Sequence, residues 1–144
     1  MENNYLVKNK RELDRLKNVL DKMNESLWNH KMGNWEVGSQ LLHLAFWDKL
    51  TFIRLSEWKH SGNLAQIPDS ITIDAINASF KSYFSLLDWK KCIFLILECA
   101  REIDDLVAGF NSEELKLLQD AGKERWYLRY IHRSEHLDKI EKSL

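Results

Sequence analysis

Apolar residues recur at steps of three and four through most of this 144-residue sequence, and few residues interrupt the pattern. Such steps match the 3.6-residue turn of an α-helix, so they place the apolar side chains along one face of each helix. One proline and five glycines are present, and these residue types most often interrupt helices. The sequence therefore predicts an all-α chain without strands.

Four long amphipathic helices are expected, over residues 4–29, 34–60, 85–110 and 123–143. Asn34 is a suitable N-cap for the second of these helices, and Gly62 is suited to end it. Asn111 and Glu114 have the spacing that caps a further short helix. Capping residues of this kind set where each helix begins and ends.

A long connection, residues 64–84, separates the second and third long helices and is expected to contain a short helix around residues 74–80. It holds the single proline, Pro68. Four amphipathic helices without strands favour a four-helix bundle, in which metal and cofactor sites are built from side chains on facing helices. A chain of this length suits a single domain, residues 1–144.

Charge and hydropathy exclude several classes of function. The chain has 21 Lys and Arg against 22 Asp and Glu, so its net charge of −1 gives no electrostatic reason to expect a nucleic acid or an anionic membrane as partner. The longest apolar run, Cys92 to Leu97, is far shorter than the roughly 20 residues of a membrane span. The polar start lacks a signal-peptide pattern, so we expect a cytoplasmic protein.

Cys92 and Cys99 lie seven residues apart in one expected helix, which separates their Cα atoms by about 10 Å and excludes a disulfide between them. Their neighbours are mostly apolar. We therefore interpret both as small core residues rather than as nucleophiles.

Three histidines carry the strongest functional signal. His132 and His136 are four residues apart, so in a helix their Cβ atoms lie about 5 to 6 Å apart on one face. With His43 from another helix they can supply three imidazole nitrogens to one metal ion, the donor set of catalytic zinc sites that keep a fourth position open. The alternative is a solvated or hydrogen-bonded pair, since short motifs of this kind also arise by chance.

Other polar and aromatic residues have two interpretations each. Asp48 lies on the apolar stripe of its helix and is either a surface residue after a small rotation or a buried partner of a metal-ligating histidine. Arg54 and Arg133 either clamp a substrate carboxylate or are simply solvated. Three tryptophans either line a pocket mouth or pack in the core, namely Trp35, Trp47 and Trp126.

Two segments resemble the DinB-like superfamily of bacterial four-helix bundles, which includes thiol-dependent S-transferases and the N-terminal domain of the mycothiol-dependent maleylpyruvate isomerase. One segment, residues 34–48, has a tryptophan followed by His43 and Asp48, and the other carries His132 and His136. The resemblance spans nearly the whole chain. It implies an up-down-down-up bundle, often a homodimer, with zinc or nickel held by His43, His132 and His136 between the second and fourth long helices.

The resemblance also implies a chemistry. Family members of known activity activate a low-molecular-weight thiol at the metal for transfer to an electrophile, and a metal-bound water for hydrolysis is the other possibility. Asp74 and Asn77 match a recurring family pattern. No residue matches a family general base, although Glu98 and Glu135 are available carboxylates, and we expect no appended second domain of the isomerase type. The alternative is a non-catalytic metal-binding or homodimeric interaction protein with the same fold.

Overall fold

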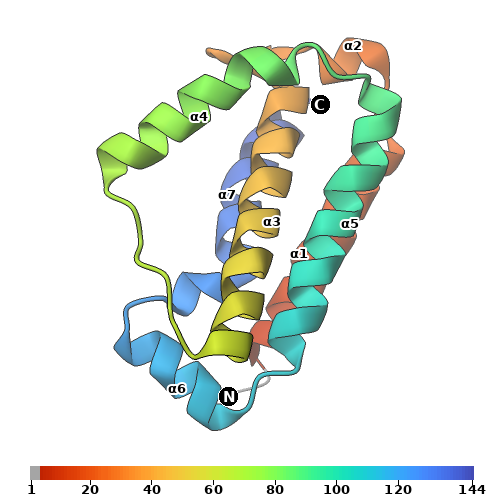
Figure 1. Cartoon of the computed structure of the whole chain (residues 1–144). Helices are drawn as coiled ribbons and strands as arrows, with labels where there is room; N and C mark the ends of the chain where they lie inside the picture. The colour runs from red at the N-terminus through yellow and green to blue at the C-terminus, as the bar shows by residue number, and fades with distance from the viewer. Residues whose placement is uncertain (1–3) are drawn as a thin grey trace.

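The computed structural model describes residues 4–144, and most of them lie in α-helices (Figure 1). The helices are α1 (Asn4–Asp21), α2 (Glu25–Trp28), α3 (Val37–Ser61), α4 (Ser70–Phe84), α5 (Trp89–Ala108), α6 (Ser112–Asp120) and α7 (Arg129–Lys142), with a 3-10 turn η1 (Glu124–Trp126). The strands β1 (Lys31–Met32) and β2 (Trp35–Glu36) pair as a small antiparallel hairpin. The all-α prediction is confirmed, and this hairpin is the one departure from it within the described residues.

The four long helices α1, α3, α5 and α7 pack side by side. Helix α3 packs against α5 and α7, and α1 packs against the same two helices. Figure 1 shows α4 and the segment that leads into it on one side of α3, away from α5. Helix α3 therefore packs against α5 on one side and against α4 on another.

Two groups of buried apolar side chains form the core between these helices. One group contains Leu16, Leu41 and Ile96, and the other contains Leu55, Ile103 and Leu118. Each of these side chains is inaccessible or nearly so, and burial of one Leu or Ile contributes about 1.5–3 kcal/mol. None of the helices within residues 4–144 combines the length and the apolar character that crossing a membrane requires.

Two of the predicted caps are confirmed and one is wrong. Asn111 and Glu114 form a reciprocal capping box at the start of α6, and Gly62 ends α3 in the left-handed conformation, with φ of 79°. Asn34 does not cap α3, because it lies in the turn of the hairpin, where Gly33 has φ of 67°. Helix α3 begins only at Val37, with Glu36 as its N-cap.

Three predicted helix boundaries are also corrected. The first helix ends at Asp21 rather than near residue 29, because Asn24 accepts a hydrogen bond from the Leu27 amide and so starts the separate helix α2. The short helix expected around residues 74–80 is longer, because Asp69 caps it through the Thr72 amide at 2.7 Å. The last helix starts at Arg129 rather than at residue 123, because the turn η1 occupies the intervening segment.

Contact between Trp28 and Gly38 seats helix α2 and the hairpin on the first turn of α3. A Cβ atom built on Gly38 would lie 2.2 Å from the Trp28 ring, a distance that real contacts essentially never show. Trp28 is buried, so its ring has little room to withdraw. Glycine at position 38 therefore permits the close approach that fixes the start of α3.

We expect Gly38→Ala to lower the free energy of unfolding by about 1–3 kcal/mol, the usual cost of overpacking a well-filled site. Gly109→Ala is the matched control, because a Cβ there would make only an ordinary contact at 3.5 Å with a backbone oxygen. Urea titrations followed by circular dichroism measure both changes. Equal stability of Gly38→Ala and the wild-type protein would contradict the packing described for Trp28.

Candidate metal centre

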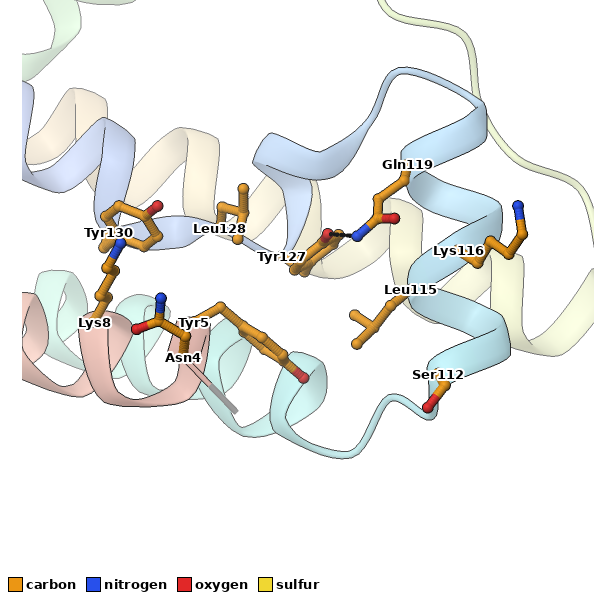
Figure 2. A pocket seen from close by; sticks show the side chains of 10 residues that line it. All are labelled: Asn4, Tyr5, Lys8, Ser112, Leu115, Lys116, Gln119, Tyr127, Leu128 and Tyr130. Carbon is orange, nitrogen blue, oxygen red and sulfur yellow. Dashed lines mark hydrogen bonds between the residues drawn. The ribbon is translucent and has the colours of Figure 1, made fainter. Parts of the chain in front are cut away.

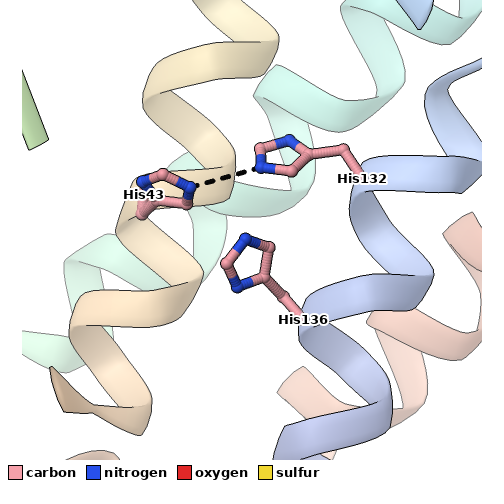
Figure 3. A group of neighbouring side chains, drawn as sticks. All are labelled: His43, His132 and His136. Carbon is pink, nitrogen blue, oxygen red and sulfur yellow. Dashed lines mark hydrogen bonds between the residues drawn. The ribbon is translucent and has the colours of Figure 1, made fainter. Parts of the chain in front are cut away.

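His43, on the second turn of α3, lies opposite His132 and His136 on α7 (Figure 3). The Nε2 atoms of His43 and His132 are 3.2 Å apart, and each of the three residues offers a ring nitrogen within 4.8 Å of the others. All three side chains are partly buried. The structure thus brings together the three histidines that the sequence singled out.

The spacing of these nitrogens suits a small divalent ion. Zinc binds imidazole nitrogen at about 2.0–2.1 Å in tetrahedral geometry, which places two ligating nitrogens about 3.3 Å apart. The 3.2 Å between His43 Nε2 and His132 Nε2 matches that tetrahedral edge. No carboxylate or thiol within residues 4–144 joins this group of three. The donor set is therefore three neutral nitrogens, which suits zinc or nickel better than calcium or magnesium.

Gln40 fixes the orientation of the His136 ring. The Nδ1 atom of His136 is hydrogen-bonded to Oε1 of Gln40, which lies one turn before His43 on α3. Because an amide oxygen only accepts, Nδ1 carries the proton and Nε2 keeps its lone pair. Partners of this kind orient metal-ligating histidines in known sites. The sequence offered no signal for Gln40 beyond its place three residues before His43.

Burial keeps the three rings neutral. It lowers the pKa of His43, which the Asn77 side chain partly opposes, and it lowers the pKa of His132 well below its ordinary value, helped by the positive charge of Arg129. Burial and the nearby His43 lower the pKa of His136 to about 3. Neutral imidazole is the form that binds a metal, so the site is ready to coordinate at physiological pH without releasing protons.

A pocket of about 440 Å³ opens beside His43 and His132. Its walls come from α3, α4, the segment before α4, and the region from residue 122 to α7. Two of the three tryptophans considered from the sequence, Trp47 and Trp126, line this pocket, whereas Trp35 lines a smaller one of about 230 Å³ next to His43 and His136. The histidine cluster therefore contacts space that a small molecule can enter.

Of the two residues suggested in the connection, one reaches the site. Asn77 lines the pocket beside His43 and accepts a hydrogen bond from the Trp47 indole at 2.9 Å. Asp74 is exposed and lines neither pocket at the cluster. Glu98 and Glu135 are exposed as well, and Glu135 pairs with Arg125 at 3.0 Å. The structure supplies no candidate general base from these carboxylates.

A buried network of charges lies next to the histidines. Asp48 on α3 accepts hydrogen bonds from Arg129 on α7, the shorter at 2.7 Å, and Asp104 on α5 forms a two-bond pair with Arg133 on α7 at 2.7 and 2.8 Å. Arg133 Nη2 also lies 3.7 Å from Asp48. These charges join α3, α5 and α7 around one point of the core.

This network corrects two interpretations drawn from the sequence. Arg133 is fully buried and paired with Asp104, so it cannot clamp a substrate carboxylate. Asp48 is 1% exposed and therefore not a surface residue, and its partners are arginines rather than a histidine. Sequence reasoning missed Arg129 and Asp104, although Arg129 and Arg133 have the same four-residue spacing as His132 and His136.

The two cysteines lie in the core, as the sequence indicated. Both side chains are buried among apolar neighbours of α5. Burial raises the pKa of the Cys92 thiol and raises that of Cys99 to about 11. Neither thiol forms an appreciable fraction of thiolate at neutral pH, so neither is suited to act as a nucleophile.

A second pocket, of about 540 Å³, lies between the start of α1 and helix α6 (Figure 2). Two tyrosines, Tyr5 and Tyr127, line it with ring centroids 5.2 Å apart, and Gln119 donates a hydrogen bond to the Tyr127 hydroxyl at 2.7 Å. It contains none of the three clustered histidines. Size alone therefore does not identify the site of chemistry in this protein.

Comparisons of the chain with protein-family models, with curated proteins and with solved structures found no match. The case for a function therefore depends on the geometry of this site and on the residues that the sequence singled out.

We expect Asp48→Ala to lower the free energy of unfolding by about 3–5 kcal/mol, because it leaves Arg129 without its buried carboxylate. Asp14→Ala is the matched control, since Asp14 forms an exposed pair with Lys10 and its loss costs less than about 1 kcal/mol. Urea unfolding of both variants measures the difference. A loss below about 1 kcal/mol for Asp48→Ala would contradict the role given to the network.

Acid should destabilise the metal-free protein through the cluster. The folded-state pKa of His136 is about 3, whereas an unfolded histidine has a pKa near 6.5, so below pH 6.5 the unfolded chain binds a proton that the folded chain does not. Stability therefore falls as the pH falls from 6.5 toward 3, by about 1.5 kcal/mol between pH 6.5 and 5 from His136. Urea unfolding at several pH values in the presence of a chelator measures this slope. His136→Gln should flatten it, and an unchanged slope would contradict a neutral, buried ring.

Proposed function

We propose that this protein is a divalent-metal-dependent enzyme of the DinB-like type, which activates a low-molecular-weight thiol for transfer to an electrophile. The observation that carries the proposal is the convergence of three neutral ring nitrogens from α3 and α7, two of them 3.2 Å apart, beside an open pocket. Zinc or nickel fits this donor set. Three protein ligands leave a coordination position for a substrate, as in catalytic rather than structural zinc sites.

The course of the helices supports the up-down-down-up topology that the resemblance implies. In Figure 1, α3 and α5 run in one direction along the molecule, and α1 and α7 run in the other. The long connection between Gly62 and Asp88, which contains α4, allows α3 and α5 to run the same way. In this topology α3 and α7 are neighbours, which is what a site shared by His43, His132 and His136 requires.

A divalent ion held by the three histidines would stabilise a bound thiol as its thiolate at neutral pH. The chain itself contributes the binding site. Gln40 holds the His136 ring in place, and Trp47 and Trp126 give the pocket aromatic walls. Since both cysteines are buried and their thiols have raised pKa values, the nucleophilic sulfur comes from the substrate. Hydrolysis uses the same ligands, and the resemblance favours thiol transfer.

The second candidate is a homodimeric protein whose metal site has no catalytic role. Several apolar side chains in the link from α4 to α5 and on the first turns of α5 are exposed, among them Leu86 at 82% and Phe94 at 72%. Apolar residues gathered on a surface often mark a contact with another chain, and the resemblance implies a second copy of this one. Sedimentation velocity of the wild-type protein and of Phe94→Glu tests this contact, and activity on thiols separates the two candidates.

We expect His132→Ala to abolish both metal retention and thiol transfer, because it removes one of three ligands. The assay follows the consumption of a panel of electrophiles by several small thiols, with zinc or with nickel, and elemental analysis reports the bound metal. His60→Ala is the matched control, since His60 is exposed at the end of α3 and outside the cluster. It should keep the metal content and activity of the wild-type protein.

The same assay tests the source of the nucleophile. Cys99→Ala should retain activity and lose only packing stability, because the Cys99 side chain fills space in the core. Loss of activity in Cys99→Ala with metal still bound would refute the substrate-thiolate mechanism. A wild-type protein that binds metal but is inactive with the whole panel would favour the non-catalytic candidate.

A further inference from the structure

The pocket beside the histidine cluster has an uneven distribution of charge. Four cationic side chains line it, Arg54, Lys123, Arg125 and Arg129, and no carboxylate does. Two of the four already have anionic partners outside the pocket lining, because Arg125 pairs with Glu135 and Arg129 pairs with Asp48. Arg54 and Lys123 are the other two cations of this lining.

Neither Arg54 nor Lys123 has a carboxylate within ion-pairing distance among residues 4–144. Lys123 is only 6% exposed, which is unusual for a lysine, since this residue is almost never buried unless it is paired. Arg54 is half-buried, and burial alone lowers its pKa. Both cations are thus held in a partly desolvated position without a compensating charge from the chain.

Both cations also lie against the same aromatic ring. The Arg54 guanidinium carbon and Lys123 Nζ are each 5.5 Å from the centroid of the Trp126 ring, in cation–π contact. Such contacts contribute about 0.5–2 kcal/mol and do not neutralise charge, so both side chains keep a full positive charge at the wall of the pocket. An anion bound beside them would supply the missing compensating charge, and charge-assisted hydrogen bonds from Arg and Lys are the strong ones.

We propose that Arg54, Lys123 and Trp126 form a carboxylate-binding subsite for an organic anion whose apolar body lies along the same pocket. Ile67, Pro68 and Ile73 provide apolar walls for that body, and Trp47 provides an aromatic one. The subsite does not need the metal, because none of its residues belongs to the histidine cluster. A reaction of the other end of this ligand beside His43 and His132 is a further step, and that step rests on the proposed function.

The geometry of α3 sets a minimum length for a ligand that contacts both ends of this pocket. His43, Trp47, Thr51 and Arg54 all line the pocket and follow one another at steps of four, four and three along α3. The first and last are eleven residues apart, so their Cα atoms are separated by about 16 Å. A ligand that contacts both ends is therefore an extended molecule of the length of a short peptide. Acetate or a single amino acid would be too small to contact both.

The test compares an acid with its uncharged analogue in the chelator-treated protein. Isothermal titration calorimetry with 6-phenylhexanoate and 6-phenylhexanamide should show that the carboxylate binds at least about tenfold more tightly, the minimum expected from charge-assisted hydrogen bonds. Inorganic phosphate, which has charge but no apolar body, should bind at least about tenfold more weakly than 6-phenylhexanoate. Equal affinity for acid and amide, no binding of the acid, or equal affinity for phosphate would overturn the proposal without any variant.

Variants assign the preference to the two cations. Arg54→Gln and Lys123→Gln should each reduce the preference for the acid over the amide to about twofold or less, and Arg54→Lys should restore part of it. Arg125→Gln is the matched control, because Arg125 lines the same pocket but is paired with Glu135, and it should keep the preference within about twofold of the wild-type value. Circular dichroism confirms that each variant is folded. Loss of the preference in Arg125→Gln alone would overturn the assignment.

Repeating the titrations with His132→Ala separates this proposal from the function of the metal centre. Unchanged discrimination between acid and amide in His132→Ala supports a carboxylate subsite that is independent of metal. Loss of discrimination in this variant, with Arg54 and Lys123 intact, would overturn the proposal even if the metal-dependent activity of the wild-type protein is established.

Discussion

The buried pairing of Asp48 with Arg129, together with that of Asp104 with Arg133, determines where α7 lies against α3 and α5. Helix α7 is a polar helix, and its buried side chains are the two arginines, Leu137 and Ile140. His132 lies between the arginines in the sequence and His136 follows one turn later. The same contacts that attach the helix therefore direct both rings toward His43.

Such a network contributes more to register than to net stability. Removal of two charges from water costs several kcal/mol each, and their mutual attraction offsets this cost only when the geometry is good, so a buried ion pair adds little to stability while its disruption is costly. A slip of α7 by one turn, about 5.4 Å, would leave at least one of the two arginines without its buried carboxylate and at least one of the two histidines away from His43. The charge network and the metal site thus depend on the same alignment of α3 and α7, and a bound ion would strengthen that alignment further.

Patterns in the sequence predicted the features that interactions between residues a few positions apart determine. The three- and four-residue spacing of apolar residues gave the helices, the pair Asn111 and Glu114 gave the start of α6, and the four-residue spacing of His132 and His136 gave two candidate ligands on one face.

The pairing of Asp48 with Arg129 was not predictable, because it joins residues 81 positions apart and depends on which helices become neighbours. The hairpin was missed because each of its strands has only two residues, and it is attached to the core by Met32 and Trp35 rather than marked by a strand pattern.

X-ray absorption spectroscopy at the zinc edge is the most direct test of the central claim, that α3 and α7 together present three imidazole nitrogens to one metal ion. Protein loaded with one equivalent of zinc should give a first shell of nitrogen or oxygen at about 2.0–2.1 Å, with outer-shell scattering from three imidazole rings. His43→Ala should fail to retain zinc, because it removes one of the three ligands. A sulfur shell near 2.3 Å, or scattering from fewer than three imidazoles in the wild-type protein, would contradict the account.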